Sequence, residues 1–363
     1  DPAAVEAHIT CHGVDYARLI GLGNAQRQCG DLESARDSYE RAVAADSTQP
    51  HAYRRLGTVL GLLGDGSRAT EAFNASRGSA QEADEAPIED VISLDAGFLS
   101  DELDFEHIAD PDGDRYPWAM ASTELTILTS CDRRYFQRFA RPLIVSMIDN
   151  AHVPMCFHFH VVNPDDSVDI LLTALRSEFP TINILHSIEQ ADVSALAPEK
   201  TYYACARFLR FMEVAKTTPG AVLVMDMDIL CLRALTDILG ELDRCRSDIG
   251  IFTLQPPTFD LWDHYQAGAV FVAPTAKAHQ VMRNCAAYIQ HFLSRRLPRW
   301  YLDQVGLFAA LNYDSGTEHG PIVTELRHDW LAVPSGDKAG NHGASPGASA
   351  VFWSLGSSHP ANA

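Results

Sequence analysis

The sequence predicts an all-α N-terminal domain of repeated helices, followed by an α/β domain with a mainly parallel sheet. Residues 16–83 contain an internal repeat. Beyond residue 123, apolar runs of strand length alternate with segments of helical periodicity, which is typical of a parallel sheet covered by helices. The run at 221–232 is apolar almost throughout, as expected of a central strand whose two faces are both buried.

The composition limits the classes of partner. The 363 residues are enough for about two domains with a full core. With 28 basic against 48 acidic side chains the formal net charge is -20, and this excludes nucleic acid because a polyanion needs a basic binding surface. The eight cysteines form no C-x-x-C pair, as expected of reduced thiols in a cytoplasmic protein. No apolar run approaches the length of a membrane span, so we expect none.

The N-terminal repeat has an offset of 34 residues. Identical or similar residues recur at Leu22/Leu56, Gly23/Gly57, Gly30/Gly64, Asp31/Asp65, Ala35/Ala69 and Tyr39/Phe73. This pattern resembles the tetratricopeptide repeat, in which small residues stand where the two helices of a hairpin come close. Two repeats are fewer than such arrays usually need, so they either pack on the next domain or belong to a longer array. We expect residues 1–83 to form this domain, and its role is either to support its neighbour or to bind a protein or peptide.

An acidic connector is expected between the two domains, at 84–122. Twelve acidic residues and no lysine or arginine lie between positions 84 and 114. Apolar residues scattered through the segment predict one or two short helices, while the charge density favours a solvated surface. The α/β domain then occupies residues 123–363.

Strands and helices alternate through the α/β domain. Strands are predicted at 124–130, 155–162, 181–185, 221–232, 248–254, 266–273 and 351–355. Helices are predicted at 136–150, 169–179, 204–215 and 275–293, with another opening near 300. Glycine, serine and alanine dominate 335–350, which indicates a loop. His158 and His160 alternate on one strand face, but no third ligand follows nearby, so ordinary packing is favoured over a metal site.

The apolar run at 221–232 contains two carboxylates, Asp226 and Asp228. Burying a bare carboxylate is costly, so the pair is expected at the carboxyl end of the strand or on a cation. In an extended chain both side chains would point to one side, where their oxygens could hold a hard divalent ion. A solvated Asp-x-Asp at the end of a strand is the alternative.

These motifs together resemble the family 8 glycosyltransferases, retaining enzymes of the GT-A fold that include glycogenin and bacterial galactosyltransferases. The resemblance covers most of the second domain, and its parts follow the family's order. It implies a GT-A domain, which binds nucleotide-diphospho-sugars, behind the tetratricopeptide repeats. It also implies transfer of a hexose from a UDP-sugar with retention, and the repeats are expected to recruit a protein acceptor.

The resemblance implies roles for individual residues. Arg207, with Arg210 as second choice, matches an arginine that contacts the nucleotide-sugar, and Asp226 and Asp228 match the metal-binding pair. The other positions implied to bind the nucleotide-sugar are Thr129, Asp132, Tyr135, Met227, Asp260, Gln266 (where the family has Asn), Gly268, Gly356 and His359.

Asp303 and Gln304 match the family's Asp-Gln pair beside the sugar and are the candidate catalytic residues. No carboxylate nucleophile stands out, so the resemblance implies a front-face mechanism with Gln304 near the anomeric centre. Asp303 and Asp260 are candidates for binding sugar hydroxyls. A capped helix start is the alternative for Asp303 and Gln304.

A divalent cation suits this charge balance. A nucleotide diphosphate is strongly anionic, and the acidic domain has few basic residues to meet it. Mn²⁺ or Mg²⁺ held by two carboxylates would supply the missing charge and stabilise the departing diphosphate. The tail departs from the family: Trp353 stands where a histidine ligand is expected, and His359 where a lysine is expected. The third metal ligand is therefore His359 or His342, or it is missing.

Two other functions were weighed against this one. The first is a weak or inactive nucleotide-sugar-binding scaffold whose repeats mediate protein interactions, and nucleotide-sugar turnover would separate it from the enzyme. The second is a phosphatase of the haloacid dehalogenase class. Its Asp-x-Asp should follow the first strand and be followed by Thr or Val, whereas here it lies deep in the domain with Leu230 at that position.

Overall fold

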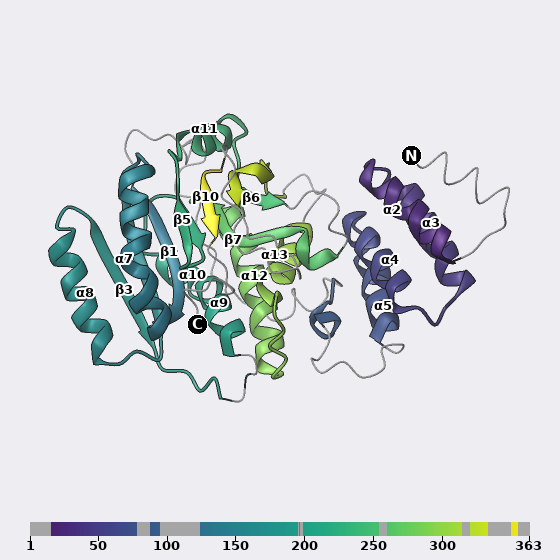
Figure 1. Ribbon diagram of the computed structural model, residues 1–363, viewed down its shortest axis with the longest axis horizontal. Helices are drawn as coiled ribbons and strands as arrows, with labels where there is room; N and C mark the ends of the chain where they lie inside the picture. The colour runs from purple at the N-terminus through teal and green to yellow at the C-terminus, as the bar shows by residue number, and fades with distance from the viewer. Residues whose placement is uncertain are drawn as a thin grey trace, which may run out of the picture.

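The computed structural model describes residues 16–77, 88–94, 124–194, 196, 199–253, 260–313, 320–332 and 350–354. An all-α domain lies beside an α/β domain, at the right and left of Figure 1 respectively. The fold class predicted from the sequence is confirmed at this level. Among the described helices, none combines the length and the apolar composition needed to cross a membrane. The cysteines of the described ranges all carry free thiols.

The N-terminal domain is a pair of helical hairpins. Its helices are α2 (Tyr16–Gln28), α3 (Leu32–Ala45), α4 (Pro50–Leu62) and α5 (Gly66–Arg77). Gly30 and Gly64 have φ values of 79° and 81°, a left-handed conformation that lets the chain turn sharply between the two helices of each hairpin.

The repeated glycines allow the two helices of each hairpin to approach. A Cβ atom at Gly23 would lie 2.5 Å from the Tyr39 ring, and one at Gly57 would lie 2.9 Å from the Phe73 ring. Both aromatic side chains are fully buried. The prediction that small residues face the partner helix at these positions is confirmed.

A seven-stranded sheet forms the centre of the α/β domain. In spatial order its strands are β3 (Asn183–Glu189), β2 (Met155–Val162), β1 (Leu125–Asp132), β4 (Val222–Met225), β7 (Tyr265–Val272), β6 (Ile249–Thr253) and β8 (Val323–Leu326). The first four are parallel, β7 is antiparallel to both of its neighbours, and β8 is parallel to β6. The sheet is therefore mixed. The connection from β6 to β7 is too short for the crossover that parallel strands require, so these two strands run antiparallel.

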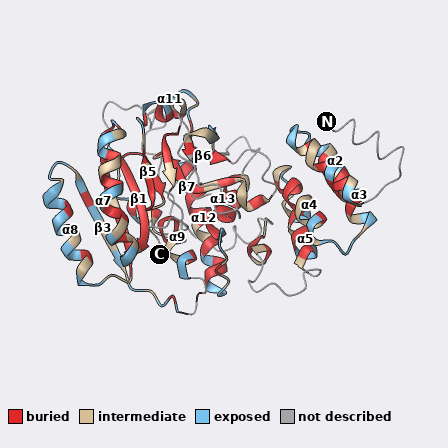
Figure 2. Cartoon of the chain, in the orientation of Figure 1, coloured by how far each residue is buried: buried red, intermediate tan, exposed pale blue. Residues whose placement is uncertain are grey.

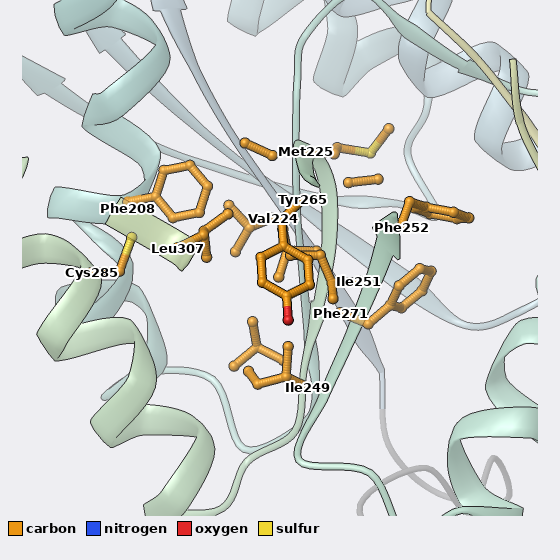
Figure 3. Close-up of a cluster of buried hydrophobic side chains, with 14 of the residues drawn as sticks. Phe208, Val224, Met225, Ile249, Ile251, Phe252, Tyr265, Phe271, Cys285 and Leu307 are labelled. Atoms are coloured by element: carbon orange, nitrogen blue, oxygen red, sulfur yellow. The ribbon is translucent and has the colours of Figure 1, made fainter. Parts of the chain in front are cut away.

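Helices cover the sheet and supply the other half of the core. They are α7 (Arg133–Asn150), α8 (Asp166–Glu178), α9 (Glu199–Leu209), α10 (Phe211–Ala215), α11 (Thr236–Arg244), α12 (Ala276–Ser294) and α13 (Leu302–Tyr313). The central strands are buried along their length, whereas α8 exposes its outer face (Figure 2). Figure 3 shows one part of this core, where Phe208 of α9 and Leu307 of α13 lie beside Val224 and Met225 of β4. Each buried side chain of this size stabilises the fold by roughly 1.5–3 kcal/mol.

The apolar run at 221–232 is not a single strand. It forms β4 and then β5 (Ile229–Cys231), with a turn at residues 226–228 between them. The second strand belongs to a separate small sheet with β10 (Phe352–Ser354) and β9 (Leu331–Ala332). The predicted helix at 204–215 is also two helices, α9 and α10, which meet at Arg210. Periodicity cannot reveal such breaks because the residues on both sides remain apolar.

The segment 88–94 lies between the two domains and contains the short 3-10 helix η1 (Ile88–Val91). The Tyr288 hydroxyl on α12 donates to the carbonyl oxygen of Val91 (2.5 Å) and accepts from the Ser93 N–H (3.0 Å). The Leu94 N–H donates to Thr70 Oγ1 on α5 (2.8 Å). Val91 and Ile92 are buried, so this part of the acidic segment is packed and not solvated.

The repeats contact the α/β domain through this segment. Because segment 88–94 contacts α5 on one side and α12 on the other, the repeats pack on the α/β domain. Asp90 adds an ion pair with Arg299 across the same junction, with its Oδ2 2.8 Å from Nη2. This packing supplies a partner surface that two repeats alone would lack.

Two glycines on α2 provide a matched test of the hairpin packing. Gly23→Ala is expected to destabilise the protein by about 1–3 kcal/mol, since its new methyl group would overlap the Tyr39 ring. Gly21→Ala meets no atom within 4 Å and should instead stabilise the helix by about 0.5–1 kcal/mol through helix propensity. Urea unfolding of both variants measures the difference. Equal effects of the two substitutions would contradict the close approach.

Candidate active site

The buried guanidinium of Arg207 joins two carboxylates from distant parts of the chain. Its side chain, on α9, is only 1% exposed. Nη1 lies 2.7 Å from Asp226 Oδ1, and Nη2 donates to Asp303 Oδ2 at 3.1 Å. The carbonyl oxygens of Ala204 and Ala267 accept two further hydrogen bonds, at 2.6 and 3.1 Å. The structure thus brings together three residues that the sequence placed in the site.

Asp226 and Asp228 lie in the turn that follows β4, at the carboxyl end of that strand. The Asp226 N–H donates to the carbonyl oxygen of Gly268 at 2.9 Å, which fixes the start of the turn against β7. The expected position at the strand end is confirmed, but the expected extended alternation is wrong because the chain turns here. As a result the two carboxylates differ: the Asp226 side chain is 37% exposed, whereas Asp228 is 9% exposed.

Burial of Asp228 disfavours the charged form of its carboxyl, which a nearby positive charge would stabilise. Loss of solvation, followed by the negative charge of Asp226, raises the pKa of Asp228 to about 7. The Arg207 guanidinium acts in the opposite direction but is the weaker influence. A divalent cation at this carboxyl would provide the charge that the chain itself does not.

Asp226 and Asp228 supply two of the ligands that a hard cation would need. Their oxygens are the ligands that Mn²⁺ and Mg²⁺ prefer. Arg207 pairs with Asp226 Oδ1, so Asp226 Oδ2 is the oxygen that could bind a cation. Within the described ranges no group of three or more His, Cys, Asp or Glu side chains is placed to hold a metal. The predicted Gly356, His359 and His342 lie outside the described residues.

Tyr135 and Asp132 lie at the junction of β1 and α7. Asp132 ends β1 and caps α7, because its Oδ1 accepts a hydrogen bond from the Tyr135 N–H at 2.8 Å. Burial and then the charges of Asp228 and Asp226 raise the pKa of Tyr135 to about 12, so its hydroxyl lies within electrostatic reach of the carboxylate pair. Asp132 therefore has a structural role that the sequence did not reveal.

The predicted positions on β1 and β7 also border the turn. The Thr129 hydroxyl, fully buried, donates to the Met227 sulfur at 3.4 Å. A Cβ atom at Gly268 would lie 3.3 Å from Asp226 Oδ2, so a side chain there would crowd the carboxylate. The Gln266 side-chain N–H group donates to the carbonyl oxygen of Asp263 at 3.4 Å.

Asp303 and Gln304 lie in the first turn of α13. Asp303 is buried, and its Oδ1 accepts from the Gln304 N–H at 3.0 Å. Burial raises the pKa of Asp303, while the adjacent Arg207 opposes that rise. The helix already begins at Leu302, so the ion pair and not a capped helix start accounts for Asp303. The Gln304 side chain donates to the carbonyl oxygen of Trp262 in the 3-10 turn η2 (Leu261–Asp263).

The repeat domain holds the loop that carries Asp260. Arg55 Nη1 of α4 lies 3.3 Å from Asp260 Oδ1. On the same helix, a Cβ atom at Gly61 would lie 2.8 Å from the Leu261 side chain and 3.5 Å from that of Phe308. Asp260 is thus engaged by the repeats, a role that the sequence did not reveal. No local pattern identifies Arg55, because its partner is 205 residues away.

A polar network beneath the site fixes the position of α9. Glu189, at the end of β3, accepts from Arg210 Nε at 3.2 Å and contacts His160 Nε2 at 2.9 Å. The Tyr202 hydroxyl also donates to Glu189. Arg210 thus pairs with Glu189 and Glu213, whereas Arg207 pairs with Asp226 and Asp303. His158 and His160 both hydrogen-bond with Ser187, in agreement with the packing role predicted for them.

Comparison with known proteins bears on the repeats and on the fold. A family model described as TPR repeat matches residues 23–64, which confirms the predicted tetratricopeptide repeats. No curated protein matches the chain by sequence.

Three solved glycosyltransferases are among the structures similar to part of this chain. Mouse xyloside xylosyltransferase 1 in its apo form is 15% identical, with a TM-score of 0.38 over 58% of this chain and 87% of that one. The bifunctional glycosyltransferase WbbM, also apo, is 15% identical, with a TM-score of 0.38 over 59% and 40%. The galactosyltransferase LgtC, in complex with donor and acceptor sugar analogues, is 13% identical, with a TM-score of 0.39 over 58% and 76%. Similarity at this level concerns the fold alone.

Removing the Arg207 charge should leave Asp303 buried without its counterion. We expect Arg207→Gln to lower the free energy of unfolding by about 3–5 kcal/mol. Arg210→Gln, three residues along and 31% exposed, serves as the control and should cost about 1 kcal/mol. Denaturant unfolding at neutral pH gives both values. Equal losses would show that the buried bridge contributes no more than a surface pair.

A double-mutant cycle tests the contact between the domains. Arg55→Ala and Asp260→Ala should show a coupling free energy of roughly 0.5–1 kcal/mol in unfolding experiments, because the arginine is mostly shielded from solvent. The exposed pair Arg141 and Glu178 is a suitable control and should couple more weakly. Additive effects of the Arg55 and Asp260 substitutions would rule out the ion pair in solution.

Proposed function

We propose that the chain is a metal-dependent glycosyltransferase that moves a hexose from a UDP-sugar to an acceptor with retention. One observation carries the proposal: Arg207 joins Asp226, at the carboxyl end of β4, to Asp303 at the start of α13. Ligands of open α/β sheets bind outside the carboxyl ends of the strands, which is where these residues lie. The sequence motifs that resemble family 8 glycosyltransferases give the same assignment.

Asp226 and Asp228 would hold the cation, through Asp226 Oδ2 and the buried Asp228 carboxylate. A bound Mn²⁺ or Mg²⁺ supplies positive charge to the diphosphate of the donor and stabilises it as a leaving group. Asp132, Tyr135 and Thr129 border the same turn from β1, where the nucleoside of the donor would bind.

Arg207 acts mainly as a positioning residue in this proposal. Its terminal nitrogens are already committed to two carboxylates and two carbonyl oxygens, so little capacity remains for a phosphate. It holds the turn after β4 and the first turn of α13 at a fixed separation. Preorganisation of this kind keeps charged groups in place before the substrate binds.

The surroundings of Asp303 support a front-face mechanism. A carboxylate nucleophile must be free to attack the anomeric carbon, but Asp303 is paired with Arg207 and accepts from the Gln304 N–H. The Gln304 side-chain nitrogen donates to the carbonyl oxygen of Trp262, and this hydrogen bond does not use the side-chain oxygen. That oxygen would face the sugar, and Asp303 would act through its ion pair with Arg207.

The repeats have a supporting role in this proposal. Because α4 contacts the loop of Asp260, part of the repeat surface is used within the chain. Recruitment of a protein acceptor would use other faces of the repeats.

The alternative function is a scaffold that binds a nucleotide-sugar without turning it over and whose repeats mediate protein interactions. Measured turnover of UDP-, GDP- and other nucleotide-sugars distinguishes the two functions.

Asp228→Asn should abolish Mn²⁺-dependent hydrolysis or transfer from a UDP-sugar. The metal-free protein should keep its unfolding midpoint, since asparagine is neutral and similar in shape to a carboxyl that is easily protonated in the fold. Asp237→Asn, at an exposed position on α11, is the matched control and should retain activity. Wild-type turnover that is the same in excess chelator as with metal would refute the metal requirement.

A further inference from the structure

The two repeats differ at the positions where the second one meets the α/β domain. With the offset of 34 residues, Arg55 on α4 takes the place of Gly21 on α2, and Gly61 takes the place of Arg27. The residues that shape the hairpins are, by contrast, shared by both repeats. Arg55 and Gly61 both lie against the loop at 260–263, which begins with Asp260. The second repeat is therefore distinguished from the first by residues that meet this loop.

Arg55 interacts with the carboxylates at both ends of the loop. Its side chain is 13% exposed, and Nη1 lies 3.3 Å from Asp260 Oδ1. Burial and then the charge of Asp260 raise the pKa of Asp263 to about 6, while the Arg55 guanidinium opposes that rise. The Asp263 N–H donates to the carbonyl oxygen of Asp260 at 3.2 Å, so the loop is one compact turn. Arg55 thus holds the turn as a unit.

The candidate catalytic amide is attached to the other side of this turn. Gln304 Nε2 donates to the carbonyl oxygen of Trp262. Phe308 follows Gln304 by four residues on α13, so their side chains lie on the same face of the helix. A Cβ atom at Gly61 would lie 3.5 Å from the Phe308 ring and 2.8 Å from the Leu261 side chain. The repeat domain therefore lies next to the Gln304 face of α13, in addition to its contact through the loop.

We infer that Arg55 is a positioning residue for Gln304, so that the repeat domain completes the candidate active site. This inference rests on the proposed glycosyl transfer, in which the Gln304 side-chain oxygen faces the sugar. The side-chain amide is planar, so the hydrogen bond from its nitrogen to Trp262 also fixes the direction of its oxygen. Arg55 holds the turn that supplies this acceptor. A displacement of about 1 Å at a reacting group can lower turnover roughly a hundredfold.

The two domains have another junction that does not involve Arg55. Segment 88–94 joins them through the Tyr288 hydroxyl, which donates to the carbonyl oxygen of Val91, and through the ion pair of Asp90 with Arg299. Loss of the Arg55 ion pair should therefore leave the domains docked. A contact that served only to dock them would change the stability of the protein but not the turnover of the folded form.

The first measurement needs no substrate. The full chain is labelled with ¹⁵N in its glutamine side chains, and the Gln304 signal is identified by its loss in Gln304→Glu. We expect Arg55→Ala to shift the Gln304 amide proton toward the position of a water-exposed amide, because the hydrogen bond to Trp262 weakens. Arg55→Lys keeps the charge and should keep most of the wild-type shift. Gly61→Ala leaves Arg55 in place but displaces Leu261, and should also move the signal.

The second measurement separates binding from turnover. Mn²⁺-dependent hydrolysis of UDP-glucose and UDP-galactose is followed for the wild type and for Arg55→Ala. We expect kcat to fall about tenfold while the KM for the donor stays within about twofold, since the turn positions the reacting group. Arg55→Lys should recover most of the rate. Arg68→Ala removes an ion pair with Glu40 inside the repeats and should hydrolyse the donor as the wild type does.

A double-mutant cycle tests whether the effect passes through Gln304. In the Gln304→Ala background, Arg55→Ala should lower kcat no further, because the side chain that it positions is already missing. Effects of the two substitutions that multiply would overturn the inference. So would an unchanged Gln304 signal in the folded Arg55→Ala and Gly61→Ala variants. If Arg55→Ala unfolds, Gly61→Ala decides the first measurement.

Failure of the inference can be told apart from failure of the proposed function. If the wild type hydrolyses no nucleotide-sugar, the proposed function fails, and the Gln304 signal still decides whether Arg55 positions this side chain. Turnover that is equal in the wild type and in folded Arg55→Ala would leave the proposed function intact and would remove the role of Arg55.

Discussion

The buried Arg207 guanidinium is the interaction on which the candidate site depends. Burying the charges of Arg207 and Asp303 is costly unless each is paired and hydrogen-bonded, and here two carboxylates and two carbonyl oxygens surround one guanidinium. The bridge fixes the turn after β4 relative to the start of α13. It also commits most of the hydrogen-bonding capacity of Arg207.

The loop at Asp260–Asp263 links the repeats to the same site. On one side it meets Arg55 and Gly61 of α4, and on the other Gln304 holds the carbonyl oxygen of Trp262. A short loop held from two domains keeps its geometry at little entropic cost, because neither end is free to move. The repeats therefore help to hold this loop in place.

Much of the fold was predictable because it depends on local pattern. The repeat spacing identified the helical hairpins, and apolar runs identified the strands β1, β2, β6 and β7 within a few residues. The prediction failed at residues 226–228, where a turn interrupts an apolar run, and at the short strands β8 and β9. In both places a few residues take their conformation from distant partners, such as Gly268 for Asp226 and Trp353 for Ala332, and not from their own periodicity.

The sequence by itself determined which chemical groups are present and the order in which they occur: the Asp-x-Asp at the end of a strand, the arginine on the preceding helix, and the Asp-Gln pair. Only the tertiary structure decided how these groups are paired. Arg207 and Asp303 are 96 residues apart, and Arg55 and Asp260 are 205 apart. Contacts at such separations follow from how helices pack on a sheet, and no local pattern encodes them. That is why Arg55 was not foreseen.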